Sequence, residues 1–282
     1  MNSPLNEVKC LINQLDLITD ESVKYVPSSY EHNKRVITSL FSPFLHKSYS
    51  QIELIDIILK QLSIIDNLYS TQLNNRTNYG LGELAEALAI LADGSLQRLS
   101  VLFIDLASAP EENINNFIVK KSRFQIYTYS NQDDSFNLFD KKYGLDKNGR
   151  PGRKAVSLIT KYAYYLTSYQ FPIYDSHVRT IAPKLWKYCN SFENPISISI
   201  KPMAVHFITE INRLKKRLDV SYDNLDRFLW YTGKIKDNNL SLLVNMNDYQ
   251  HYAGRSIHSD HYSLVSIILD IFSFAHKLNN IS

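Results

Sequence analysis

A long amphipathic helix is the feature that most constrains how this chain can fold. Ser50 and Glu53 have the spacing of a capping box, in which each side chain accepts a hydrogen bond from the other residue's backbone amide. From there to Tyr69, apolar residues recur every three or four positions, at 54, 55, 58, 62, 65 and 69. Because this periodicity keeps one helical face apolar, it predicts a helix over residues 50–69 with that face in a core.

The same helical periodicity recurs along the chain, and strand patterns are rare. Only Ile196–Ile200 alternates apolar and polar residues as a strand does, and it is short. The sequence therefore predicts an all-α, or mainly α, fold. Further helices are expected near residues 82–92, 95–107, 111–120, 153–168, 176–188, 202–218, 222–232 and 260–277.

Length and composition narrow the class of protein. The chain has 282 residues, of which 44% are hydrophobic, so it can bury a full core as one globular unit or as two closely associated lobes. Apolar runs such as Ala87–Ala92 are too short to span a bilayer, and Met1–Pro4 lacks the charged and apolar regions of a signal peptide. We therefore expect a cytoplasmic monomer with no membrane partner.

The cysteines and histidines argue against a metal or a cofactor. Cys10 and Cys189 are the only cysteines, which excludes a disulfide framework, and the chain alone cannot build a four-cysteine iron–sulfur cluster or zinc ribbon. His251, His258 and His261 lie close together in the sequence, but a metal site needs a more convincing set of ligands. We interpret them as polar residues in a turn before the last helix, and expect no metal and no cofactor.

Positive charge is concentrated in one segment. The net charge of +3 is too small to indicate a polyanionic partner by itself, yet between residues 141 and 161 seven basic residues accompany a single acid, Asp146. Cations clustered round a glycine-bearing turn suit contacts to the phosphates of DNA or RNA, and the alternative is a solvated loop with incidental lysines. The seven residues are Lys141, Lys142, Lys147, Arg150, Arg153, Lys154 and Lys161.

A family resemblance begins at this basic turn. Gly149-Arg150-Pro151-Gly152 leads into an expected helix, which breaks at Phe171-Pro172, and Asp175 and His177 open the next helix. This order resembles the helix-hairpin-helix DNA glycosylases, in particular the 8-oxoguanine glycosylase branch, whose hairpin is followed by a segment reading Pro-x-Asp-x-His. Pro172, Asp175 and His177 correspond to that segment.

The resemblance implies two helical lobes flanking a cleft. Residues 76–190 would form the helix-hairpin-helix lobe with the catalytic segment, and residues 1–75 and 191–282 would form a second lobe from both termini. It also implies DNA contacts from the hairpin residues Gly149, Arg150, Gly152 and Arg153. His177 would bind a phosphate or brace the turn, and its alternative is a surface position on the helix.

The resemblance assigns the chemistry to a carboxylate and a lysine. Breaking an N-glycosidic bond requires stabilisation of positive charge on the sugar, and Asp175 is the candidate; it can also serve as an ordinary N-cap, and the two roles can coexist. A lysine can displace the base as a nucleophile, for which the family points to Lys154 and Lys161 competes; either can instead bind phosphate. Because most of the seven cations must face solvent or DNA, we predict a monofunctional enzyme in which water attacks.

The sequence also offers walls for a base pocket and leaves alternatives open. A flipped base stacks on aromatic side chains, and the candidates are Tyr69, Phe171, Tyr174 and Trp230, although aromatic residues at helical spacing more often form core. The predicted function is a DNA glycosylase that removes an oxidised base, or a modified base in foreign DNA as a defence enzyme. The alternatives are a non-catalytic helix-hairpin-helix DNA-binding protein and a helical protein-interaction module whose tyrosines are core.

Overall fold

The chain divides into two compact units. Its structure, a computed structural model, describes residues 3–16, 29–69, 71–109, 124–127, 135–190 and 204–236, with positions 270, 271, 273–275, 277 and 278. The terminal unit comprises Met1–Arg35, Asp175–Ile200 and Glu210–Ser282, and the central unit comprises Val36–Tyr174 and Lys201–Thr209.

Four helices form the body of the central unit. Helix α4 (Gln51–Leu68) packs against α6 (Gly80–Ala92) and α9 (Val156–Leu166), and α7 (Leu96–Ser108) packs against α6 and α9. Within the described ranges no single helix is long and apolar enough to cross a membrane. The pair α6 and α7 meets that test of length and composition only together, and it is bent by 88° at the break.

Helix α4 forms as its sequence predicts. Glu53 Oε2 accepts a hydrogen bond from Ser50 N at 2.8 Å, and Ser50 Oγ accepts one from Glu53 N at 3.4 Å, so the capping box is complete. The expected apolar face is buried, since Leu54, Ile58 and Leu62 have no exposed surface. Burial of this face against α6 and α9 supplies most of the hydrophobic stabilisation of α4.

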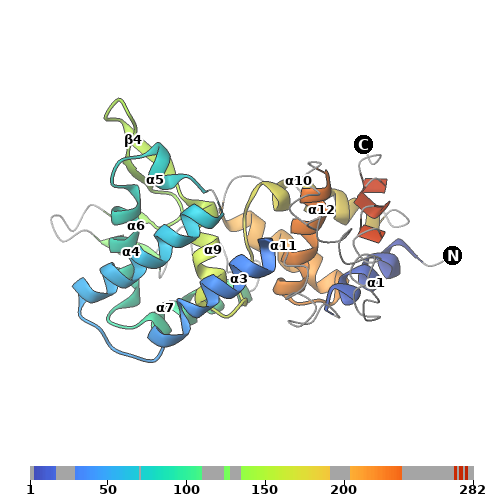
Figure 1. The fold of residues 1–282 in the computed structure, drawn as a ribbon, viewed down its shortest axis with the longest axis horizontal. Helices are drawn as coiled ribbons and strands as arrows, with labels where there is room; N and C mark the ends of the chain where they lie inside the picture. The colour runs from blue at the N-terminus through green and yellow to red at the C-terminus, as the bar shows by residue number, and fades with distance from the viewer. Residues whose placement is uncertain are drawn as a thin grey trace, which may run out of the picture. The chain divides into compact units, whose positions relative to one another are not determined.

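Shorter elements complete the central unit. They are the end of α3 (Ser29–Ser39), the 3-10 helix η1 (Ser42–Phe44), α5 (Leu73–Arg76), the antiparallel pair β1 (Gln125–Tyr127) and β2 (Ser135–Asn137), and the antiparallel pair β3 (Lys142–Leu145) and β4 (Pro151–Lys154). Figure 1 shows the β3–β4 hairpin extending beyond α5. Both sheets of the described residues are two-stranded hairpins, so the prediction of a mainly α fold is confirmed.

The terminal unit joins the two ends of the chain around one helix. Helix α12 (Tyr222–Lys236) packs against α1 (Pro4–Asp16) and α10 (Ser176–Cys189). Helix α11 (Ala204–Leu218) begins in the central unit and ends in this one.

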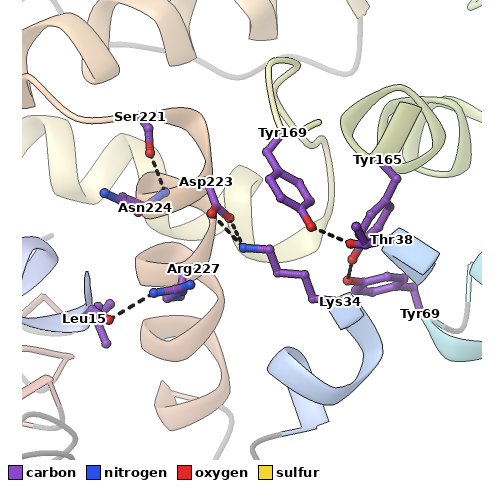
Figure 2. Close-up of polar contacts among 10 residues, drawn as sticks. All are labelled: Leu15, Lys34, Thr38, Tyr69, Tyr165, Tyr169, Ser221, Asp223, Asn224 and Arg227. Carbon is purple, nitrogen blue, oxygen red and sulfur yellow. Dashed lines mark hydrogen bonds and ion pairs between the residues drawn. The ribbon is translucent and has the colours of Figure 1, made fainter. Parts of the chain in front are cut away.

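Polar contacts tie the N-terminal helices of this unit to α12. Lys34 Nζ donates to both carboxylate oxygens of Asp223 at 2.6 and 2.7 Å, and the pair is largely buried (Figure 2). Arg227 Nη1 donates to the backbone oxygen of Leu15 at 3.0 Å.

The observed division between the units differs from the expected one. The boundaries fall at 35/36, 174/175, 200/201 and 209/210, whereas the sequence resemblance placed them at 75/76 and 190/191. Helix α4 joins the central unit because its apolar face packs on α6 and α9, and α10 joins the terminal unit because it packs on α12 and α1. Tertiary packing therefore decides to which unit α4 and α10 belong.

Several expected helices are confirmed, and other elements were not expected. The helices near 82–92, 95–107, 176–188, 202–218 and 222–232 are present, with every end within four residues of the expected one. Helices α1 and α3 and the strands of both hairpins were not foreseen. Residues 111–120, the expected strand Ile196–Ile200 and most of 260–277 lie outside the described residues.

Candidate functional site

The basic glycine-bearing segment is a β-hairpin, which corrects the expectation of a helix-hairpin-helix at this place. Lys142 pairs with Lys154, and Leu145 pairs with Pro151. Asp146 builds the connecting turn, because its Oδ1 accepts from Asn148 N at 2.8 Å and from Arg150 N at 2.9 Å. Strand residues precede the turn, so no helix leads into it.

Close backbone packing fixes this hairpin to the segment before α6. Asn78 and Leu145 exchange two backbone hydrogen bonds, Asn78 N to Leu145 O at 2.8 Å and Leu145 N to Asn78 O at 3.0 Å. A Cβ on Gly144 would lie 2.2 Å from Asn78 O, and a Cβ on Gly152 would lie 2.1 Å from Tyr143 O. Gly152, a predicted DNA contact, is thus required for packing inside the hairpin.

The hairpin exposes cations. Lys142, Lys147 and Arg150 are all exposed, and none of them enters an ion pair with another residue in the described ranges. Gly149 has a φ of +72° and nothing within 4 Å of an added Cβ, so it is needed for the turn conformation alone. These three cations therefore form an open basic surface on a well-anchored hairpin, the surface expected for phosphate contacts.

Arg153, another predicted DNA contact, is committed to the protein. Its guanidinium donates to the backbone oxygen of Thr71. Burial lowers the pKa of Arg153, the charge of Arg76 lowers it further, and Asp66 opposes both effects. Asp66 is itself buried and accepts from Leu73 N at 2.8 Å, so it caps α5. Arg153 thus ties the hairpin to the loop between α4 and α5.

The two candidate lysines lie in different environments. Lys154 ends β4, two residues before α9 begins, and its side chain is 45% exposed and ion-paired with Asp140 at 2.7 Å, which corrects its expected place on a helix. Lys161 lies inside α9 and is only 4% exposed. Its Nζ donates to Ser157 Oγ at 3.1 Å and lies 5.3 Å from the ring centroid of Tyr69, a cation–π contact.

Tyrosines near Lys161 link α9 and the segment after it to the end of α4 and to α3. The hydroxyls of Tyr69 and Tyr165 are hydrogen-bonded, and Tyr165 also stacks on Phe41, with ring centroids 6.2 Å apart. Tyr169 and Thr38 share a second hydrogen bond of 2.5 Å between their hydroxyls. Figure 2 shows both hydroxyl pairs between α3, α9 and the end of α4. Tyr69 is half-buried in this cluster, whereas Tyr165 belongs to the core.

Asp175 caps helix α10. Its Oδ1 accepts a hydrogen bond from Val178 N at 3.0 Å, and the residue is half-buried at the start of the terminal unit. The preceding residues Phe171–Tyr174 are buried in the central unit, where Tyr174 N donates to Thr160 Oγ1 at 3.0 Å. The N-cap interpretation of Asp175 is confirmed, and the carboxylate is held in a defined orientation.

His177 packs against the backbone of α12. A Cβ added to Gly233 would lie 2.2 Å from His177 Nδ1, so only a glycine leaves room for the imidazole there. His177 is half-buried. His177 therefore packs the first turn of α10 against α12, and a phosphate contact from it stays a prediction.

The predicted base-pocket residues do not form one cluster. Phe171 is fully buried edge-on to Phe103, with ring centroids 5.3 Å apart. Tyr174 is buried against Phe207 at 5.1 Å. Trp230 belongs to the terminal unit, where it meets Tyr231 edge-on. Tyr69 contacts Lys161, a candidate catalytic residue, through the cation–π interaction described above.

No metal site is found in the part of the chain that the structure describes. No group of three or more His, Cys, Asp or Glu side chains is close enough there to hold an ion. Cys10 is exposed, and Cys189 is buried, which raises the pKa of its thiol to about 12. His251, His258 and His261 lie outside the described residues.

Comparison with known proteins assigns this chain to no family. No family model matches the chain, and no curated protein and no solved structure shows a significant match to it. The likeness to the helix-hairpin-helix glycosylases is therefore a likeness of sequence motifs.

Proposed function

We propose that this chain is a DNA glycosylase, which flips a damaged or modified base out of the duplex and hydrolyses its N-glycosidic bond. The observation that carries the proposal is the placement of Asp175, a half-buried carboxylate held at the first turn of α10 directly after a buried aromatic segment. A carboxylate at a helix N-terminus is stabilised as an anion and held in one orientation. Both properties suit the stabilisation of a sugar cation.

In the proposed reaction, Asp175 acts on the sugar and on water. The C1′–N bond breaks, and its electron pair leaves with the nucleobase, which takes up a proton. The Asp175 carboxylate stabilises the positive charge that develops on the sugar, and the oxygen of a water molecule forms a new bond to C1′. The carboxylate accepts the proton that this water loses, and the product is an abasic site.

Binding of the DNA is assigned to the β3–β4 hairpin. Lys142, Lys147 and Arg150 are exposed on it, and the three nearby acids have other partners: Asp140 pairs with Lys154, Glu83 pairs with Lys141, and Asp146 holds the turn. Contacts from such cations to phosphates release counterions and bind DNA of any sequence. The hairpin would therefore supply affinity without choosing the base.

We propose a monofunctional reaction, and Lys161 is the residue against which this part must be tested. Lys154 is exposed, and its Nζ is engaged by the Asp140 carboxylate. Lys161 is buried beside Tyr69, and Thr160, its neighbour in α9, accepts the hydrogen bond from the backbone of Tyr174, which directly precedes Asp175. An amine nucleophile in this chain would accordingly be Lys161.

The direct test is release of a base. The full chain is incubated with duplexes that each carry one oxidised, alkylated or naturally modified base, and mass spectrometry measures the free base. Release from one class of duplex, with an abasic site left in the strand, supports the proposal and separates a repair substrate from modified foreign DNA. Absence of release from every duplex that the protein binds would contradict it.

A second function, a DNA-binding protein without catalysis, has one observation in its favour. Tyr162, Tyr164 and Tyr165 are buried in the core, as are Phe171 and Tyr174. These rings are therefore accounted for by packing, and Asp175 is accounted for by capping. Tight binding of all duplexes without base release would favour this function.

A further inference from the structure

Tyr79 stands out among the aromatic residues because it is not in the core. Its side chain is 79% exposed, the largest exposure of any large apolar or aromatic side chain in the described ranges. It precedes the first residue of α6, in the central unit. A single exposed aromatic side chain is common on protein surfaces and does not by itself indicate a binding role. A second, independent observation is therefore needed.

The backbone of Tyr79 provides that observation. Its φ and ψ are +62° and +2°, the left-handed conformation, which is unfavourable for a residue with a bulky side chain. Glycine or asparagine adopts this conformation more readily. No local structural reason therefore favours tyrosine at this position, and the ring itself is the feature that needs an explanation.

The neighbours of Tyr79 on both sides impose this conformation. Asn78 exchanges two backbone hydrogen bonds with Leu145, and Tyr79 O accepts from Glu83 N at 3.1 Å in the first turn of α6. A Cβ on Gly80 would lie 2.4 Å from Thr77 Oγ1, so the turn is tightly packed behind the tyrosine. The ring is thus presented from a rigid support rather than from a loose loop.

Tyr79 lies next to the exposed Leu145 and to segments that expose polar and basic side chains. Leu145, the hairpin partner of Asn78, is 42% exposed. Besides the turn residue Asn148, seven exposed polar side chains of residues 74–78 and 142–150 are cations or amides, and this composition complements a polyanion with apolar faces in its interior. They are Asn74, Asn75, Arg76, Asn78, Lys142, Lys147 and Arg150.

We propose that Tyr79 is a stacking wedge, which inserts its ring against the bases of duplex DNA at the step that the flipped nucleotide has left. Leu145 would contact the neighbouring base, and the hairpin cations would contact the flanking phosphates. Apolar wedges of this kind stabilise an unstacked base step, and an aromatic ring stacks on any base. The inference rests on the proposed function in taking DNA with an extruded base as its partner.

The test uses a duplex that needs no reaction. The full chain is titrated with a duplex that carries a central tetrahydrofuran abasic-site analogue, and with the same duplex fully paired. We expect Tyr79→Ala to weaken binding of the analogue duplex by roughly fivefold to a hundredfold, with little change for the paired duplex. Tyr79→Trp should retain the preference, and Ile52→Ala, which removes another exposed apolar side chain (75%) of the same unit, should change neither affinity.

A second variant separates stacking from folding. Tyr79→Gly removes the ring and also relieves the left-handed backbone, so it should lose the same affinity while its thermal unfolding midpoint stays equal or rises. A lowered midpoint would show that the ring is a packing element, and would overturn the inference.

The outcomes also separate this inference from the proposed function. If Tyr79→Ala and Tyr79→Gly bind the analogue duplex as the unmodified chain does, the wedge is wrong although DNA binding stands. If the unmodified chain binds neither duplex, the wedge and the proposed function both fail. A loss of analogue preference in a protein that releases no base from any duplex would support the wedge and contradict the glycosylase.

Discussion

The β3–β4 hairpin and the segment around Asp175 differ in exposure, in charge and in the contacts that hold them in place. The hairpin exposes Lys142, Lys147 and Arg150, and its packing is provided by backbone contacts at Gly144 and Gly152. The segment from Phe171 to Tyr174 is buried, and it leads to a carboxylate whose orientation a helix fixes. Under the proposed function, this difference corresponds to a division of labour, in which the hairpin would supply affinity for phosphates and Asp175 would supply the chemistry.

The strongest test of this division is Asp175→Asn. Asparagine also caps helices, so folding should be retained, but it has no negative charge to stabilise the sugar cation. We expect single-turnover base release to fall by about a thousandfold or more, with DNA affinity changed less than twofold. Asp175→Ser, another good N-cap, serves as the matched control for capping and should be equally inactive. Wild-type rates in either variant would make Asp175 purely structural.

The converse test is charge reversal at Lys147 and Arg150. Each lost phosphate contact should reduce the slope of log affinity against log salt by roughly one, and binding at low salt should weaken by about ten- to a hundredfold. Base release at saturating DNA should be unchanged, because neither residue contributes to the chemistry. Lys60→Glu, an exposed lysine of α4, controls for net charge. An unchanged salt dependence in the double variant would remove the hairpin from the DNA interface.

A smaller effect, on stability, should distinguish the glycine needed for close packing, Gly152, from the glycine needed for the turn conformation, Gly149. Gly152→Ala forces a Cβ to within 2.1 Å of Tyr143 O and 2.7 Å of Thr77 Cγ2, so it should lower the unfolding free energy by about 1–3 kcal/mol. Gly149→Ala meets no atom within 4 Å and should cost only about 1 kcal/mol, from its positive φ. Thermal unfolding of the two variants measures the difference. Equal midpoints would mean that the hairpin is not fixed by its close packing.

The smallest expected effect concerns the lysines. For a monofunctional enzyme, borohydride added during turnover should trap no covalent adduct between protein and DNA, since no Schiff base forms. The assay is run with Lys161→Ala and Lys154→Ala in parallel and analysed by denaturing gel. An adduct that disappears in only one variant would identify that lysine as the nucleophile and contradict the monofunctional proposal.

Several of these features could be predicted from local sequence. The capping box at Ser50 and Glu53 and the apolar spacing up to Tyr69 predict α4, because both depend on residues within one or two turns. For the same reason the sequence offered an N-cap role for Asp175 beside the catalytic one, and Asp175 does cap α10. Helices with a continuous apolar face need no information from the rest of the chain to be located.

The hairpin shows why the same reasoning was wrong elsewhere. Gly149 and Gly152 were interpreted as the hairpin of a helix-hairpin-helix, but Gly149 lies in the turn of a β-hairpin and Gly152 is needed where its backbone approaches that of Tyr143. The strands are four residues long and rich in lysine, so they carry little alternation of polar and apolar residues. Their link to Asn78 joins residues 67 positions apart, which no local pattern reveals.

The sequence by itself determined helices such as α4, the concentration of positive charge between residues 141 and 161, and the suitability of Asp175 as an N-cap, because these follow from neighbouring residues. Tertiary structure decided that Lys161 is buried beside Tyr69 while Lys154 is exposed, and that Tyr79 is held outward in a left-handed conformation. Tyr69 is 92 positions from Lys161 and Leu145 is 67 positions from Asn78, so these environments exist only once distant segments have packed together.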